Sequence, residues 1–157
     1  FTDADLREDV RQRFIDAGVE ADRVEVLPKA ESLTDHLGLY SRVDIALDPF
    51  PYNGTTTTCE ALYMGVPVVT VAGALHAGRV GASLLSAIGL PELIARDEDE
   101  YVNKAVSLAA DVPRLTTLRA SMRQRMLNSP LCDGQAYARR MESLLRNEWR
   151  DWCLSKA

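Results

Sequence analysis

Apolar residues in the first 95 positions gather in short runs separated by amphipathic stretches. These runs are rich in Val, Ile and Leu, a composition typical of strands buried in a parallel sheet. They are RVEVL (23–27), VDIAL (43–47), VPVVTV (66–71) and a last short run at 93–95. Because the runs alternate with helical patterns, the sequence predicts an α/β fold with a Rossmann-like parallel sheet flanked by helices.

The helices are predicted from apolar residues at helical spacing, with capping residues before them and Gly or Pro near their ends. The first helix is capped by Thr2 with Asp5 and stops at Gly18. A short second helix begins at Ser32 with Asp35. Further helices are expected over about 55–64, 79–88, 98–110 and 113–127, and from 134 onward.

From residue 97 the pattern is purely helical, so we expect one partial lobe over 1–157 with 97–157 as its helical C-terminal segment. Two features suggest part of a larger protein. Four short strands are few for a stable sheet, and Trp149 and Trp152 on the last helix need a surface to bury against. A second copy of the chain could supply that surface, so self-association through this helix is one expectation.

Composition narrows the class of protein. A net charge of −5 argues against a nucleic-acid backbone as the main partner. The apolar runs are too short to span a membrane, and the N-terminus lacks the pattern of a signal peptide. Cys59, Cys132 and Cys153 match no disulfide or metal-binding spacing. We therefore expect a cytoplasmic protein with small buried thiols and no metal site.

The stretch YNGTTTTCE (52–60) carries the main candidate chemistry. It follows the VDIAL strand, and ligands of open α/β sheets bind beyond the carboxyl ends of the strands. A helix N-terminus offers unpaired N–H groups, and Gly54 after Asn53 lets the backbone approach a ligand closely. The hydroxyls of Thr55, Thr56 and Thr57 can add donors to the same anion. The stretch therefore predicts a cradle for a diphosphate.

Glu60 lies one turn into this helix, too far in to cap it. A carboxylate there would repel a phosphate unless a ribose separates the two, and ribose hydroxyls can donate to one carboxylate. An anion cradle with an acid one turn later therefore indicates a nucleoside diphosphate site. The alternative is a plain helix cap followed by a Glu that faces solvent.

Three more residues are candidates at the same edge of the sheet. His36, in the helix before the VDIAL strand, can stack on a base or bond to a phosphate, or it can be structural. His76 and Arg79 follow the next strand and can face the ligand, or they can be loop residues.

Long stretches of the chain resemble the catalytic C-terminal region of the family 41 glycosyltransferases, the O-GlcNAc transferase and SPINDLY group. The stretches are VDIALDPFPYNGTTTTCEALYMGVPVVTVAG, VGASLL, ELIARDEDEYVNKAVSLAADV, LRASMRQRM, SPLCDG and ESLLRNEWRDWC. The resemblance covers nearly the whole chain after about residue 20. The four-threonine form followed by CE is most similar to SPINDLY proteins and their bacterial relatives.

The resemblance implies a GT-B glycosyltransferase with two lobes, of which this chain forms most of the C-terminal, donor-binding lobe. It implies that Thr55, Thr56 and Thr57 hold the donor diphosphate, that Glu60 binds the ribose, and that His36 packs by the base. The implied reaction moves GlcNAc or fucose from a nucleotide-sugar to Ser or Thr of proteins. It needs no metal or other cofactor. Catalytic residues are expected on the missing lobe, and the protein acceptor is expected to bind through that lobe and the tetratricopeptide repeats.

Four positions depart from the animal O-GlcNAc transferases. Leu33 and Leu39 stand where those enzymes have a Lys and an Arg that contact the nucleotide. Glu60 stands where they have Asp, and Thr55 stands where they have His. SPINDLY-type proteins use GDP-fucose, so the donor, UDP-GlcNAc or GDP-fucose, stays open. Two alternative functions also stay open: a GT-B enzyme with a non-protein acceptor, and a non-catalytic nucleotide-binding module.

Overall fold

The computed structural model describes residues 3–156, and the chain divides into two compact units, Phe1–Leu39 and Tyr40–Ala157. The single lobe predicted over 1–157 stays a prediction. The first unit contains α1 (Ala4–Asp16), η1 (Ala21–Arg23) and α2 (Leu33–Leu39).

Local capping explains where the helices of the first unit begin and end. The predicted cap at Thr2 lies outside the described residues, and Asp3 caps α1 by accepting a hydrogen bond from the backbone N–H of Asp5 at 2.9 Å. Gly18, with φ of 92°, follows the end of this helix, because glycine adopts that backbone conformation without steric cost. Ser32 accepts a hydrogen bond from the N–H of Asp35 at 3.1 Å, as the sequence predicts.

The strand predicted at 23–27 is wrong. Arg23 ends η1, and Val24 is extended but belongs to no strand. The described sheet consists of strands of the second unit, and none of the residues 23–27 takes part in its pairing. An extended segment becomes a strand only when its N–H and C=O groups find such partners.

The second unit is built on a three-stranded parallel sheet in the order β1-β2-β3. Ala46 pairs with Val68 at one end of the register, and Val71 pairs with Ala95 at the other. The parallel α/β fold with flanking helices is therefore confirmed. Its elements, in chain order, are η2 (Tyr40–Arg42), β1 (Ala46–Leu47), α3 (Thr56–Tyr63), β2 (Val68–Val71), η3 (His76–Gly78), α4 (Val80–Ala87), η4 (Pro91–Leu93), β3 (Ile94–Ala95), α5 (Glu98–Ala110), α6 (Val112–Leu127) and α7 (Gly134–Ser155).

β1 is shorter than the predicted run at 43–47, and Arg119 on α6 supplies a reason. Its guanidinium donates hydrogen bonds to the backbone carbonyls of Val43 and Asp44. These carbonyls are therefore satisfied by a side chain instead of a neighbouring strand. Regular pairing begins only at Ala46, whose N–H donates to the carbonyl of Pro67 at 2.9 Å.

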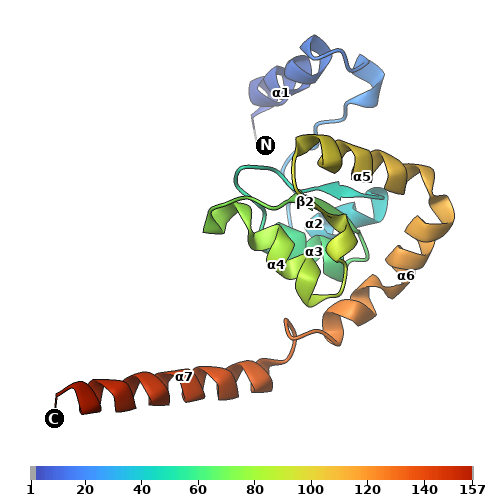
Figure 1. Cartoon of the computed structure of the whole chain (residues 1–157). Helices are drawn as coiled ribbons and strands as arrows, with labels where there is room; N and C mark the ends of the chain where they lie inside the picture. Colours follow the sequence, from blue (N-terminus) through green and yellow to red (C-terminus); the bar gives the residue numbers. More distant parts are fainter. Residues whose placement is uncertain (1–2, 157) are drawn as a thin grey trace. The chain divides into compact units, whose positions relative to one another are not determined.

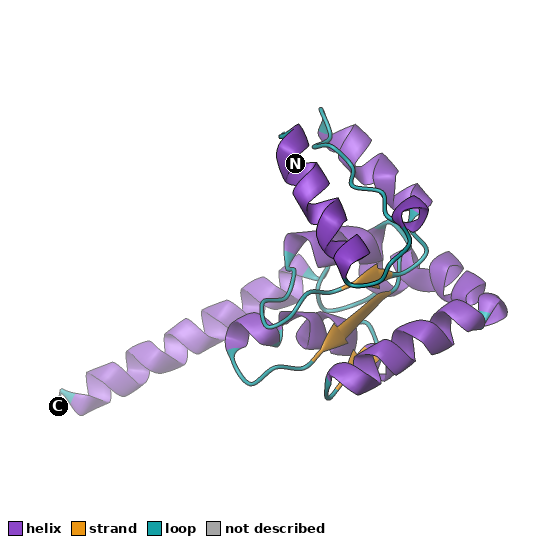
Figure 2. Ribbon diagram, turned by 90° about the horizontal axis from the view of Figure 1, so that it is seen from above, coloured by secondary structure: helices purple, strands orange, loops and turns teal. Residues whose placement is uncertain are grey.

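Helices cover both faces of this sheet. Figure 1 shows α5 above β2 and α3 and α4 below it, and Figure 2 shows the strands lying among helices. The core is apolar, and every helix from α3 to α6 contributes to it. Its fully buried members include Leu62, Val68, Val69, Leu85, Leu108 and Met122. This packing fixes where β1 and β2 end, and therefore where the loops that follow them begin.

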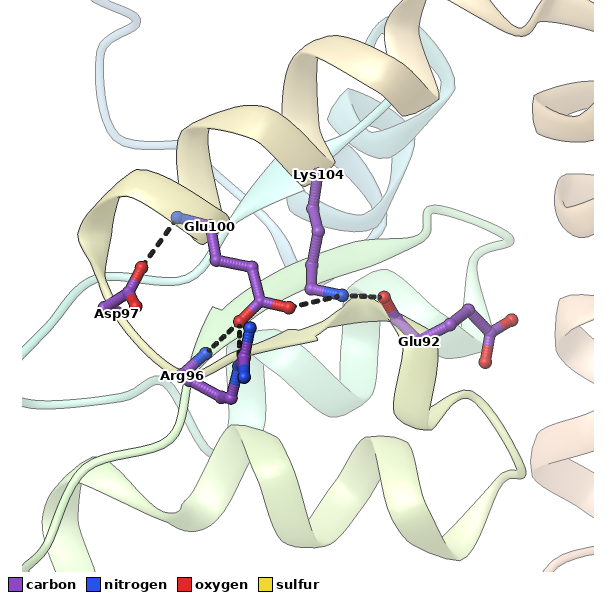
Figure 3. A network of polar contacts seen from close by, with 5 residues as sticks. All are labelled: Glu92, Arg96, Asp97, Glu100 and Lys104. Carbon is purple, nitrogen blue, oxygen red and sulfur yellow. Dashed lines mark hydrogen bonds and ion pairs between the residues drawn. The ribbon is translucent and has the colours of Figure 1, made fainter.

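A polar network holds the turn from β3 into α5 (Figure 3). Asp97 caps α5 by accepting from the N–H of Glu100 at 2.8 Å, and Lys104 donates to the carbonyl of Glu92 at 2.8 Å. Hydrogen bonds from the side chain and backbone of Arg96 lower the pKa of Glu100 to about 2. Because these charges bind one another, we assign this network a structural role.

The final helix, α7, has no buried residue and presents an apolar stripe. Its aromatic members include Trp149 and Trp152, which are 63% and 53% exposed and stack with ring centroids 5.2 Å apart. Within the single chain these tryptophans therefore remain exposed, and their burial against a second copy stays a prediction. Among the described residues, none of the helices has the length and apolar character required to cross a bilayer.

Candidate functional site

The loop between β1 and α3 is anchored by the buried carboxylate of Asp48, which is 3% exposed. Its Oδ1 atom accepts a hydrogen bond from the N–H of Gly54 at 2.7 Å. Its Oδ2 atom accepts from the hydroxyl of Thr70 on β2, also at 2.7 Å. Asp48 therefore ties the residue just before the threonine helix to the neighbouring strand, a role that the sequence analysis did not assign to it.

Asn53 lies inside the protein, with 1% of its surface exposed. Its Nδ2 group donates to the carbonyl of Pro49 at 3.0 Å, and its Oδ1 atom accepts from the N–H of Gly81 at 3.3 Å. Its own N–H donates to the carbonyl of Ala77 at 2.8 Å. Both ends of the side-chain amide therefore hold the loop in place. Asn53, which the sequence offered as a ligand-binding candidate, has a structural role in this loop.

Gly54 is packed too closely for any side chain. A Cβ atom there would lie 2.7 Å from the hydroxyl oxygens of both Thr57 and Thr58, and 3.3 Å from Oδ1 of Asp48. The first turn of α3 can therefore fold back over residue 54 only because this residue is glycine. The expected close approach of the backbone to a ligand at Gly54 stays a prediction.

Thr55, Thr56 and Thr57 are exposed at the N-terminus of α3, whereas Thr58 is buried. Thr55 is the N-cap residue, with φ of −114° and ψ of −72°, and its side chain makes no capping hydrogen bond. The alternative of a plain side-chain cap is therefore not what the structure shows. An exposed helix N-terminus with neighbouring hydroxyls can accommodate an anion.

Glu60 is half-buried, which also departs from the alternative of a Glu facing solvent. The hydroxyl of Tyr40 lies 3.3 Å from its Oε2 atom and 3.2 Å from the backbone carbonyl of Thr57. Burial, and next the negative charge of Glu60, raise the pKa of Tyr40 to about 12. The phenol is therefore protonated at neutral pH and can donate. The sequence analysis missed Tyr40, because no local motif marks it.

A cavity of about 150 Å³ lies beside this first turn of α3. Tyr40 and Thr57 line it together with Asp48 and Pro49, which follow β1. The cavity lies between the carboxyl end of β1 and the first turns of α3, the edge that open α/β sheets use for ligands. Thr55, Thr56 and Glu60 are not among the residues that line it, so this cavity is not by itself the predicted nucleoside diphosphate site.

The other candidates lie in different surroundings. His36 is half-buried on α2 in the unit Phe1–Leu39, so its place beside a base stays a prediction. His76 and Arg79 are exposed around η3. Arg79 donates to the carbonyl of Gly73 at 3.3 Å, which gives it a local structural contact, and the ligand role of both residues also stays a prediction.

Comparison with known proteins identifies the chain's relatives. The model of the family described as glycosyl transferase family 41 matches residues 4–141. A probable UDP-N-acetylglucosamine–peptide N-acetylglucosaminyltransferase SPINDLY from Solanum lycopersicum is 53% identical over 148 residues, which cover 92% of this chain and 16% of the relative. A UDP-N-acetylglucosamine–peptide N-acetylglucosaminyltransferase from Caenorhabditis elegans is 34% identical over 91% of this chain and 12% of its own length.

A solved structure is similar over nearly the whole chain. It is a mutant of the O-GlcNAc transferase of Thermobaculum terrenum, with a TM-score of 0.91 and 38% sequence identity. The match covers 99% of this chain and 30% of the solved one. The resemblance drawn from the sequence is confirmed. The chain also spans much less than the length of these relatives.

Proposed function

Because the chain belongs to glycosyl transferase family 41, we propose that it binds the nucleotide-sugar donor of a protein O-glycosyltransferase. In this reaction a sugar moves from a nucleoside diphosphate to a Ser or Thr hydroxyl of a protein. The observation that carries the proposal is the first turn of α3: three exposed threonines follow a glycine held by buried Asp48, and half-buried Glu60 lies one turn on. Relatives whose names describe peptide acceptors support the choice of a protein acceptor over a non-protein one.

The proposed chemistry uses the positive end of α3 and the hydroxyls of Thr55, Thr56 and Thr57. When the bond between sugar and phosphate breaks, negative charge builds up on the leaving diphosphate. Backbone N–H groups, hydroxyls and a helix dipole that already point at this position stabilise that charge without reorganising. The proposed transfer therefore needs no metal. A module that only binds nucleotide, the second alternative, would keep the cradle without transferring sugar.

Replacing Glu60 with alanine in the full-length protein tests the ribose assignment. The variant is expected to bind the nucleoside diphosphate more weakly by about 1–3 kcal/mol, or roughly 5- to 150-fold, because a charge-assisted hydrogen bond is lost. A 2′-deoxy nucleotide should lose much less affinity in the variant than the ribonucleotide does. Calorimetric titration of both ligands measures the difference.

The matched control is Glu98→Ala, which removes an exposed glutamate from the first turn of α5. Its affinity for both nucleotides should equal that of the unmodified protein. Equal losses for the two nucleotides in the Glu60 variant would remove the ribose role.

The identity of the base and sugar is a separate proposal. We expect GDP to bind the full-length protein at least as tightly as UDP, since by resemblance Leu33 and Leu39 replace charged contacts of UDP-using enzymes. Competition of the two nucleotides for one labelled donor measures this preference. A clear preference for UDP would favour UDP-GlcNAc, the donor in the names of these relatives, over GDP-fucose. Self-association through α7 also stays a prediction.

A further inference from the structure

Tyr40 bridges one turn of the helix that carries the candidate site. Its hydroxyl lies 3.2 Å from the carbonyl of Thr57 and 3.3 Å from Oε2 of Glu60, residues three positions apart on α3. A phenol has one proton, so the two acceptors share one donor. The ring is half-buried and lines the 150 Å³ cavity beside Thr57. This contact joins residues 20 positions apart in the sequence.

The hydrogen bond has a direct consequence for the carboxylate of Glu60. A glutamate side chain has several rotatable bonds, and ordering a flexible side chain costs up to about 2 kcal/mol. The phenol beside Oε2 orders the carboxylate before any ligand binds. The entropy lost when the ligand binds is therefore smaller, which strengthens binding. A carboxylate can accept about four hydrogen bonds, so a bond from Tyr40 is compatible with bonds from ribose hydroxyls.

We propose that Tyr40 is a positioning residue for the ribose subsite, holding the carboxylate of Glu60 in the orientation that accepts from the sugar hydroxyls. The inference rests on the proposed function, in which Glu60 binds ribose. It adds a residue that acts through Glu60 and does not itself touch the nucleotide. Protonation supports it: the raised pKa of Tyr40 keeps the phenol a donor throughout the neutral range.

The test is Tyr40→Phe in the full-length protein, a change that removes only the hydroxyl. Affinity for the ribonucleoside diphosphate is expected to fall about 2- to 10-fold, the effect of one hydrogen bond. Affinity for the 2′-deoxy nucleotide should change less than 2-fold, because the positioned carboxylate then has fewer ribose hydroxyls to accept from. In a Glu60→Ala background, Tyr40→Phe should have no further effect on ribonucleotide affinity.

Tyr63→Phe is the matched control, since Tyr63 is the last residue of the same helix and is 42% exposed. The guanidinium of Arg123 lies over its ring, 4.7 Å from the centroid, and phenylalanine preserves the ring. Both nucleotides should bind this variant normally. Titration of five proteins completes the comparison: the wild type, the two tyrosine variants, Glu60→Ala and the double variant Tyr40→Phe, Glu60→Ala.

The outcomes distinguish a failure of the role proposed for Tyr40 from a failure of the ribose role proposed for Glu60. If Tyr40→Phe weakens both nucleotides equally, the hydroxyl acts through the carbonyl of Thr57 and the inference is overturned. If Glu60→Ala shows ribose-dependent loss and Tyr40→Phe shows none, the inference also fails while the ribose role of Glu60 stands. If Glu60→Ala shows no ribose-dependent loss, the ribose assignment itself falls, and the inference falls with it.

Discussion

The 157-residue chain, purified by itself, is expected to transfer no sugar to protein acceptors. Transfer requires donor and acceptor to be held together, and such positioning supplies on the order of 7–11 kcal/mol in favourable cases. The chain corresponds to 30% of the solved O-GlcNAc transferase, and the proposed site accounts only for the donor. An acceptor hydroxyl would therefore reach the sugar only by random collision, and the rate should fall to background.

The measurement is incubation of the chain with UDP-GlcNAc or GDP-fucose and a broad mixture of acceptor proteins, followed by detection of the transferred sugar. The control is the double variant Thr56→Ala, Thr57→Ala, which lacks two hydroxyls of the proposed cradle. Turnover above this control would show that the chain alone is catalytically complete. The proposal that its site accounts only for the donor would then be wrong.

Replacing Gly81 with alanine is expected to lower the free energy of unfolding of the chain by about 2 kcal/mol or more. A Cβ atom there would overlap Oδ2 of Asp48 and the hydroxyl of Thr70, and would lie 2.9 Å from Cβ of Thr70. Overpacking costs about 1–3 kcal/mol, and disrupting the buried hydrogen bond between these side chains costs about as much. The better helix propensity of alanine offsets only about 1 kcal/mol.

Urea unfolding of the chain measures this effect, as a lower midpoint with an unchanged slope. Gly134→Ala is the matched control, because Gly134 begins α7 and no atom lies within 4 Å of a Cβ atom placed there. The control should be neutral or slightly stabilising, by up to about 1 kcal/mol. Equal urea midpoints for the two variants would contradict this prediction. They would mean that Asp48 and Thr70 can move to accommodate the added methyl group without a loss of stability.

Local patterns in the sequence determined most helices and the class of fold. The helix predicted over 98–110 is observed as Glu98–Ala110, and Asp97 caps it. Gly65, with φ of 87°, follows the end of the helix predicted over 55–64. Caps and helical periodicity involve residues within about four positions of one another, so their physics can be read from a short stretch of chain.

Strands were harder to predict, because their existence depends on distant partners. The run at 23–27 has the composition of a strand but takes no part in the pairing of the described sheet, and the start of the run at 43–47 gives its carbonyls to Arg119, about 75 positions away. The run VPVVTV forms a strand only over β2, Val68–Val71. Pairing, and not β propensity alone, decides the outcome.

The same division applies to the candidate site. The sequence by itself placed Thr55, Thr56 and Thr57 at the start of a helix beyond a strand, and their exposure there agrees with that pattern. Only the tertiary structure decided which residues support them. Asp48 meets Thr70 across 22 positions, and Tyr40 meets Glu60 across 20. Such contacts form only when the sheet and its helices pack together, because burial leaves a polar group no partner but another part of the folded chain.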